Sequence, residues 1–185
     1  MKKLKLMFML AAGMFAAVGC NDDDDNNQPA IAEADRMFVM NAADGGMFEV
    51  RAGELAVAKG DSSATGVVMG SDSMSIKSFG QMMITDHTMA NNELKNIADP
   101  KQVEIPATLS SAKQKMLDSL NTASGTAFNT MYARMMVTSH METVSLFDRQ
   151  ANTGQDNELK SWASQKLPTL RHHLEMAEMM QDEVK

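Results

Sequence analysis

The sequence contains few of the residues that build disulfide-bonded, thiolate-liganded or β-rich domains. It has one cysteine, one tryptophan and one tyrosine among 185 residues, and four prolines. A single thiol excludes an intrachain disulfide and any metal site built from several cysteines. Valine and isoleucine are also scarce, and no run alternates apolar and polar residues over the length of a strand. This pattern argues against a β-sheet.

The only cysteine, Cys20, closes a segment with the layout of a secretory signal. Lysines at positions 2, 3 and 5 precede an apolar run from Leu6 to Val18, which is too short to span a bilayer as a mature helix. The segment ends in AAVGC, and small residues before a cysteine are typical of a bacterial lipoprotein signal. We therefore predict that residues 1–19 are removed and that acylated Cys20 anchors an outer-membrane lipoprotein. A plain secretory signal with a chance cysteine is the alternative.

An acidic stretch, NDDDDNNQP, runs from Asn21 to Pro29. Four adjacent aspartates repel one another and have nothing to bury, so residues 20–32 are predicted to be a disordered, solvated tether. Such a run also resembles the surface-export signal of lipoproteins in some Gram-negative bacteria. A simple spacer is the alternative, so the protein could face the periplasm or the cell surface.

Acidic charge limits the partners of the mature chain. Removal of residues 1–19 takes away three lysines and moves the formal charge from −7 to −10. Phosphate binding depends on basic side chains, so we expect no nucleic-acid partner. We expect membrane contact through the lipid anchor only. The sequence does not identify a protein partner.

Residues 33–185 are predicted to form one all-α domain with one core, because helical periodicity runs through most of the segment. Five helices are expected, at about 33–59, 73–99, 111–121, 124–151 and 157–182, the third of them short and capped by a serine. Gly45-Gly46 predicts a kink or short break in the first helix, and Pro168 predicts a kink in the last. The stretch 60–72, rich in glycine and serine, is predicted to be a loop.

The lengths of the connections favour one topology. Short turns within the first and the last pair of long helices indicate two antiparallel hairpins. The longer middle connection, which holds the short helix, can cross from one hairpin to the other. This is the single-crossover arrangement of a ferritin-like four-helix bundle. An up-down-up-down bundle is the alternative.

Two similar segments lie in the middle of the second and third long helices. MMITDH ends at His87 and MMVTSH ends at His140, and each places a methionine four residues before its histidine on one helical face. Two similar hairpins would relate these positions by approximate two-fold symmetry. An ancestral repeat and a chance likeness of two amphipathic helices both remain open.

Depth along the helices links these histidines to two further residues. By the expected bounds, Glu49, His87, His140 and His173 lie 14 to 16 residues from the start of their helices. At ~1.5 Å per residue they share one layer of the bundle within about a turn. The three histidines fall on apolar stripes, so we predict that all three face inward.

Four segments carry a resemblance to a known family: FEVRAGELA (48–56), MMITDHTMANNEL (82–94), FNTMYARMMVTSHMETVSLF (128–147) and LPTLRHHLEMA (167–177). They resemble the bacterial family called domain of unknown function 4142, a ferritin-like group of exported proteins, over about residues 35–180. The spacing of Asp86-His87, His140 and Pro168 to His173 fits the family pattern. Asn129 departs from it, since the family commonly has aspartate there, which weakens any role for a carboxylate at that position. The resemblance implies the fold and leaves the activity open.

One functional hypothesis is a metal site. Glu49, His87, His140 and His173 would supply one carboxylate and three imidazoles, a set that suits zinc, copper or nickel. Asp86 would be an outer partner that orients a histidine. A di-iron oxidase is disfavoured, because such sites need several carboxylates and a Glu-x-x-His on two helices. No histidine here has a glutamate three residues before it.

The 20 methionines invite a copper version of this hypothesis, because thioether sulfur selects Cu(I). Methionine also fills helical cores much as leucine does, and we favour that role for most of them. His172, Met176 and Met179 lie at helical spacing and form a candidate copper site on the surface.

The second hypothesis, which the sequence favours, is a structural or interaction module of the cell envelope. Its histidines would then be buried hydrogen-bonding groups that specify helix register. No Ser-His-Asp arrangement, P-loop or dinucleotide fingerprint is visible, so the sequence favours a non-enzymatic role. The distance between ring nitrogens separates the hypotheses, because shared ligation requires them roughly 3–4 Å apart.

Overall fold

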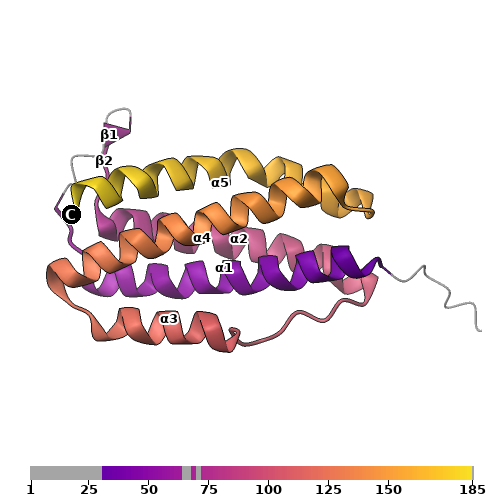
Figure 1. Ribbon diagram of the computed structural model, residues 1–185, viewed down its shortest axis with the longest axis horizontal. Coiled ribbons are helices and arrows are strands. Elements are labelled where there is room, and N and C mark those ends of the chain that lie inside the picture. The colour runs from indigo at the N-terminus through magenta and orange to yellow at the C-terminus, as the bar shows by residue number, and fades with distance from the viewer. Residues whose placement is uncertain (1–30, 64–67, 70–71, 185) are drawn as a thin grey trace, which may run out of the picture.

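The computed structural model describes residues 31–63, 68–69 and 72–184, and five α-helices dominate this part of the chain (Figure 1). They are α1 (Glu33–Lys59), α2 (Ile76–Ala98), α3 (Ser111–Thr122), α4 (Gly125–Thr153) and α5 (Asn157–Glu183), with a short 3-10 helix η1 (Asp99–Lys101). The prediction of an all-α bundle is confirmed. The predicted signal, Cys20 and nearly all of the acidic tether lie outside the described residues.

The segment between α1 and α2, predicted to be a loop, contains a short pair of strands that the sequence did not predict. Two strands of two residues each, β1 (Val68–Met69) and β2 (Asp72–Ser73), pair antiparallel within it. Such short pairing leaves no periodic signal in the sequence. The helix that follows begins three residues later than predicted, because Ser75 and Ser78 form a capping box at its start.

Contacts at the two ends of the bundle fix the direction of the helices. Lys101, at the end of η1, pairs with Asp156 at 3.0 Å beside the start of α5. At the opposite end, Thr130 near the start of α4 donates to the carbonyl of Val184 at 2.7 Å. Helices α2 and α4 therefore run in one direction, and α1 and α5 run in the other (Figure 1). The predicted single crossover is observed, and the up-down-up-down alternative is wrong.

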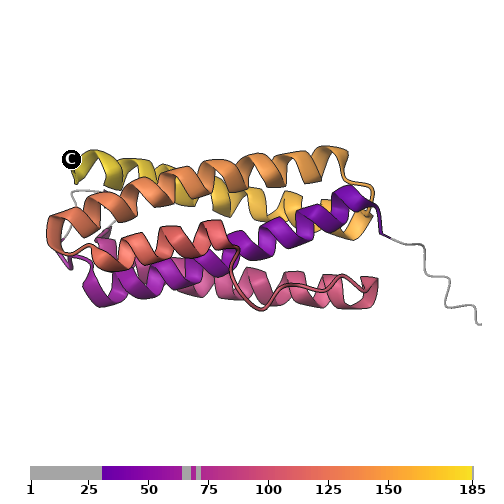
Figure 2. The same cartoon turned by 60° about the horizontal axis from the view of Figure 1, so that its bottom comes forward.

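The crossover runs along the outside of the bundle. It leaves η1 as an extended segment and continues into α3, which lies against α1 (Figure 2). Ser110 caps α3 by accepting from the Lys113 amide at 3.3 Å, as predicted. The Ser110 hydroxyl in turn donates to Asp44 of α1 at 2.7 Å, which fastens the start of α3 to the bundle.

Helix α1 continues through Gly45-Gly46, so of the predicted kink or short break the short break is wrong. The reason is close packing: a Cβ on Gly46 would lie 2.0 Å from Oδ1 of Asn91 on α2. Farther along, a Cβ on Gly80 would lie 2.6 Å from the Cβ of Ala56. The glycines at this interface bring α1 and α2 together and do not interrupt a helix. Helix α5 likewise continues through Pro168.

A polar layer divides the core in two. One apolar cluster, at the end of the bundle where α4 begins, includes Phe79, Met83, Tyr132, Met136 and Met176. The other, the tryptophan cluster, includes Phe38, Leu94, Phe147, Trp162 and Leu170. On α2, α4 and α5 a buried histidine falls between members of the two clusters. This layer is the candidate site.

Candidate metal centre

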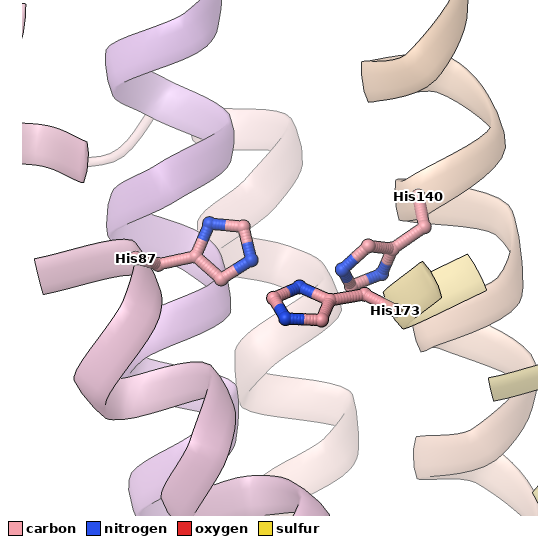
Figure 3. Close-up of side chains that lie close together, drawn as sticks. All are labelled: His87, His140 and His173. Atoms are coloured by element: carbon pink, nitrogen blue, oxygen red, sulfur yellow. The ribbon is translucent and has the colours of Figure 1, made fainter. Parts of the chain in front are cut away.

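Three histidines from three helices meet in the middle of the bundle. His87 comes from α2, His140 from α4 and His173 from α5, and their rings point toward a common space (Figure 3). Their exposed fractions are 6%, 1% and 2%. The prediction that all three face inward is confirmed. Each is inward because its apolar stripe, with a period near 3.6, buries the same face of its helix.

The three rings form a nearly equilateral triangle. Ring centroids are 5.6 Å apart for His87 and His140, 5.6 Å for His87 and His173, and 5.5 Å for His140 and His173. One nitrogen from each ring lies within 4.8 Å of the other two. Ligation at ~2.0–2.1 Å per bond brings such nitrogens to roughly 3–4 Å, so a shared ion requires a small inward rotation of the rings.

Outward contacts of His140 and His173 fix which nitrogen of each of these two rings carries its proton. Nδ1 of His140 lies 2.9 Å from the carbonyl oxygen of Met136, which only accepts, so this nitrogen donates. Nε2 of His173 lies 3.0 Å from Oδ2 of Asp86 and donates to that carboxylate. The remaining nitrogens, Nε2 of His140 and Nδ1 of His173, therefore present lone pairs.

Those lone pairs have no hydrogen-bond partner in the part of the chain that the structure describes. Within the described residues, Nε2 of His87, Nε2 of His140 and Nδ1 of His173 are buried and make no hydrogen bond. An unpaired buried polar atom costs about 1–3 kcal/mol. Three such atoms lie in this one layer, on three different helices, which makes the layer a candidate site.

The imidazoles of His87 and His173 are held in the form that can ligate. Burial lowers the pKa of His87 well below its usual 6.5, and the neighbouring His140 and His173 lower it further. Burial also lowers the pKa of His173 to about 4, against the opposing effect of Asp86. At neutral pH both rings are uncharged, and a neutral imidazole is the metal-binding form.

Glu49, the predicted carboxylate ligand, lies beside the triangle and does not join it. Its Oε1 is 3.8 Å from Nδ1 of His140, the nitrogen that faces away from the other two rings. Burial raises the pKa of the Glu49 carboxyl, while His140, Ser139 and Lys113 act to lower it. Neither carboxylate oxygen has a hydrogen-bond partner of good geometry among the described residues.

Two further buried polar groups belong to this layer, and the sequence reasoning missed both. The hydroxyls of Ser139 and Tyr132 are buried and make no hydrogen bond of good geometry among the described residues, although Ser139 is close enough to Glu49 to lower its pKa. Burial and Glu49 raise the pKa of Tyr132 well above its usual value. A usable signal was present for Tyr132: it is the only tyrosine, and it stands on the apolar stripe of its helix eight residues before His140.

The other sequence-predicted positions lie elsewhere. His172 is half exposed, whereas Met176 is buried in the core, so the candidate copper site is not assembled on the surface. Asn129 lies at the end of the bundle, where its Oδ1 accepts from the amide of Asp61 at 3.2 Å. The buried methionines Met83, Met136 and Met180 pack with the apolar core, in keeping with the core-filling role.

A cavity of about 260 Å³ adjoins the triangle. His87 and His173 form part of its wall, whereas His140 and Glu49 do not. Its rim includes Met89, which is 54% exposed, so the cavity extends from the surface to the two histidines.

Comparison with known proteins gives one match, which covers the whole bundle. The model of one family, described as "Domain of unknown function (DUF4142)", matches residues 21–180. No curated protein and no solved structure matches the chain. Among the described residues, no helix is both long and apolar enough to cross a membrane.

Proposed function

The chain belongs to this DUF4142 family, and we propose that its bundle binds one divalent transition-metal ion, zinc or copper, through His87, His140 and His173. The observation that carries the proposal is the convergence of three buried, unpaired ring nitrogens from three helices. A cation among them would accept all three lone pairs at once. Imidazole is a preferred ligand of both metals.

The outer contacts support the same proposal. Metal-binding histidines usually donate their second ring N–H to a carboxylate or a backbone carbonyl, which sets the tautomer and the ring orientation. Asp86 accepts from His173 in this way, and the Met136 carbonyl accepts from His140. Glu49 is close enough to His140 to influence its basicity without being a ligand.

The structural or interaction module predicts a different arrangement. Buried histidines that only specify register should have both ring nitrogens satisfied by protein groups. Here the outward nitrogens of His140 and His173 are satisfied and the inward ones are not. The geometry therefore favours metal over a purely structural role, although the sequence favoured the reverse.

Metal binding is tested by equilibrium dialysis of the purified protein against zinc and, separately, against copper. We expect one tightly held equivalent per chain. His140→Ala removes a ligand and should abolish it, whereas His172→Ala, which changes the exposed neighbour of His173, should retain it. Absence of a stoichiometric equivalent in the unaltered protein would contradict the proposal.

We also propose that acylation of Cys20 anchors the protein in the outer membrane, where it faces the periplasm or the cell surface. The basic start, the apolar run and the AAVGC ending support this processing. Cys20→Ala should move the protein from the membrane fraction to the soluble fraction of cells. Protease treatment of intact cells then distinguishes the two orientations.

A further inference from the structure

We propose that the metal centre has an open coordination position facing the adjoining cavity, and that this position takes the carboxylate of a small organic acid whose apolar part fills the cavity. This inference rests on the proposed metal site. It goes beyond that site by assigning a class of ligand. The juxtaposition that carries it is a cavity whose inner wall consists of two of the three converging histidines.

The coordination number provides the first step. Zinc sites with three protein ligands keep a fourth position for water or a substrate. Three ligand atoms converge among the described residues, and Glu49 approaches His140 at Nδ1, the nitrogen bonded to the Met136 carbonyl. Phe79 covers another side, with its ring 6.4 Å from His140 and 6.5 Å from His173. The cavity lies on the side of His87 and His173.

The charge of the centre provides the second step. Three neutral imidazoles bring no negative charge to a divalent cation, and a buried, uncompensated charge is costly. An anionic donor in the fourth position offsets part of that cost. Lys166, on the cavity wall, does not compete strongly for the anion, because its Nζ pairs with Glu93 at 2.5 Å. The cation is therefore the main attraction for a carboxylate.

The walls provide the third step. Beyond the histidines, the cavity has an apolar and aromatic part formed by Ala42, Ala90, Phe147, Trp162 and Leu170. Its polar lining residues are Asp86, Asn91, Thr143, Lys166 and Thr169, of which Asp86 is engaged by His173 and Lys166 by Glu93. Ligand pockets usually have a few polar groups that fix one end of a ligand and apolar walls that cover the rest. A volume of about 260 Å³ restricts the ligand to a small molecule. A carboxylate with a short chain or a single ring fits this description.

Cobalt(II) provides a spectroscopic test, because its visible absorption responds to the ligands it binds. The purified protein is loaded with one equivalent of cobalt and titrated with benzoate, with benzamide as the uncharged control. We expect benzoate to change the spectrum saturably and benzamide to leave it unchanged.

Two variants reduce the cavity. Ala90→Phe fills it from α2, and Thr169→Trp, at an exposed position on α5, narrows it independently. Asn92→Phe adds the same ring as the first variant at an exposed position outside the cavity.

Each cavity variant that still binds one equivalent of cobalt should bind benzoate at least tenfold more weakly, and Asn92→Phe should bind it as the unaltered protein does. If cobalt binds and benzoate leaves its spectrum unchanged, the inference is overturned and the metal site stands. The same holds if cobalt-loaded cavity variants bind benzoate with unaltered affinity. If the unaltered protein binds no cobalt, zinc or copper, both the inference and the proposed function fail.

Discussion

His173 and Asp86 join α5 to α2 through one hydrogen bond, 3.0 Å long, between Nε2 and Oδ2. The His173 side chain is 2% exposed and the Asp86 side chain is 35% exposed, so a partly exposed carboxylate orients a buried ring. Its bond fixes the proton on the outward nitrogen and leaves the inward nitrogen free. Asp86 also lines the cavity, so it lies between the solvent and the proposed metal centre.

Replacing Asp86 should weaken the metal site without unfolding the bundle. Loss of such an outer partner typically costs 10–100-fold in metal affinity, because the ring loses both its orientation and part of its basicity. We expect a loss of about this size for Asp86→Ala, and a smaller one for Asp86→Asn, which keeps an acceptor. Competition with a chelator measures the affinity for zinc. Asp148→Ala breaks a surface ion pair with Arg171 and is the control; equal affinity in the Asp86 and Asp148 variants would refute a positioning role.

The metal-free protein should become less stable as the pH falls below about 6.5. The folded-state pKa of His173 is about 4 and that of His87 is well below 6.5, so the unfolded chain binds more protons in this window. The free energy of unfolding then decreases by up to about 1.4 kcal/mol per pH unit for each histidine. Glu49 acts in the opposite sense above its ordinary pKa, because its raised pKa makes the folded state bind a proton first.

Urea unfolding of the metal-free protein near pH 7 and near pH 5 measures this dependence. His173→Gln should reduce the difference between the two conditions more than His172→Gln does, because His172 is half exposed and only adds to the lowering of the His173 pKa. Equal stability at the two pH values would show that the buried rings take up protons in the folded state as readily as in the unfolded chain.

We expect the Glu49 side chain to lower the free energy of unfolding of the metal-free protein. Its carboxylate is buried with neither oxygen hydrogen-bonded in good geometry among the described residues. Replacement by an apolar side chain of similar size removes that desolvation penalty, which is about 1–3 kcal/mol for such a group. We expect Glu49→Leu to unfold at higher urea concentration than the unaltered protein when both are metal-free. A clear loss of stability would mean that the carboxylate makes a favourable contact in solution.

Replacement by alanine should have opposite effects at two glycines, Gly80 at the α1–α2 interface and Gly45 on the side of α1 that faces α4. A Cβ on Gly80 would meet the Cβ of Ala56 at 2.6 Å and the Gly53 carbonyl at 2.9 Å, so Gly80→Ala must push the helices apart. Overpacking of this kind costs about 1–3 kcal/mol. At Gly45 the nearest atom would be Thr143 Oγ1 at 3.8 Å. Gly45→Ala should therefore stabilise the protein by about 0.5–1 kcal/mol through its higher helix propensity. Denaturant unfolding of both variants checks the two signs.

Helical periodicity predicted the helices and the inward direction of the three histidines, because a stripe with a period of 3.6 identifies the buried face. It also placed Glu49 at the same depth, since rise per residue fixes position along the axis. Depth does not fix where a side chain lies around the axis. The close approach of α1 to α2 and the partner of each ring nitrogen depend on packing between helices. Glu49 is an example: it lies at the depth of the histidines, but packing between helices places it beside His140 and outside the triangle.

The similarity of MMITDH and MMVTSH has a packing explanation. The expected two-fold relation between these segments does not fit a tandem duplication of one hairpin. Such a duplication would relate α2 to α5, the second helices of the two hairpins, but the similar segments lie on α2 and α4. Both segments bury a methionine and a histidine four residues apart: Met83 with His87, and Met136 with His140. Two helices that each bury a methionine and a histidine at the same level of the bundle need similar sequences there, so the likeness does not require a common ancestor.

X-ray absorption at the zinc edge, recorded on protein that retains one equivalent of zinc, tests the central claim most directly. The structure predicts a first shell at about 2.0–2.1 Å that is rich in nitrogen, together with the outer-shell scattering of three imidazole rings. His140→Ala should lower the imidazole contribution or release the metal. A shell of oxygen atoms without imidazole scattering would contradict a metal site at His87, His140 and His173.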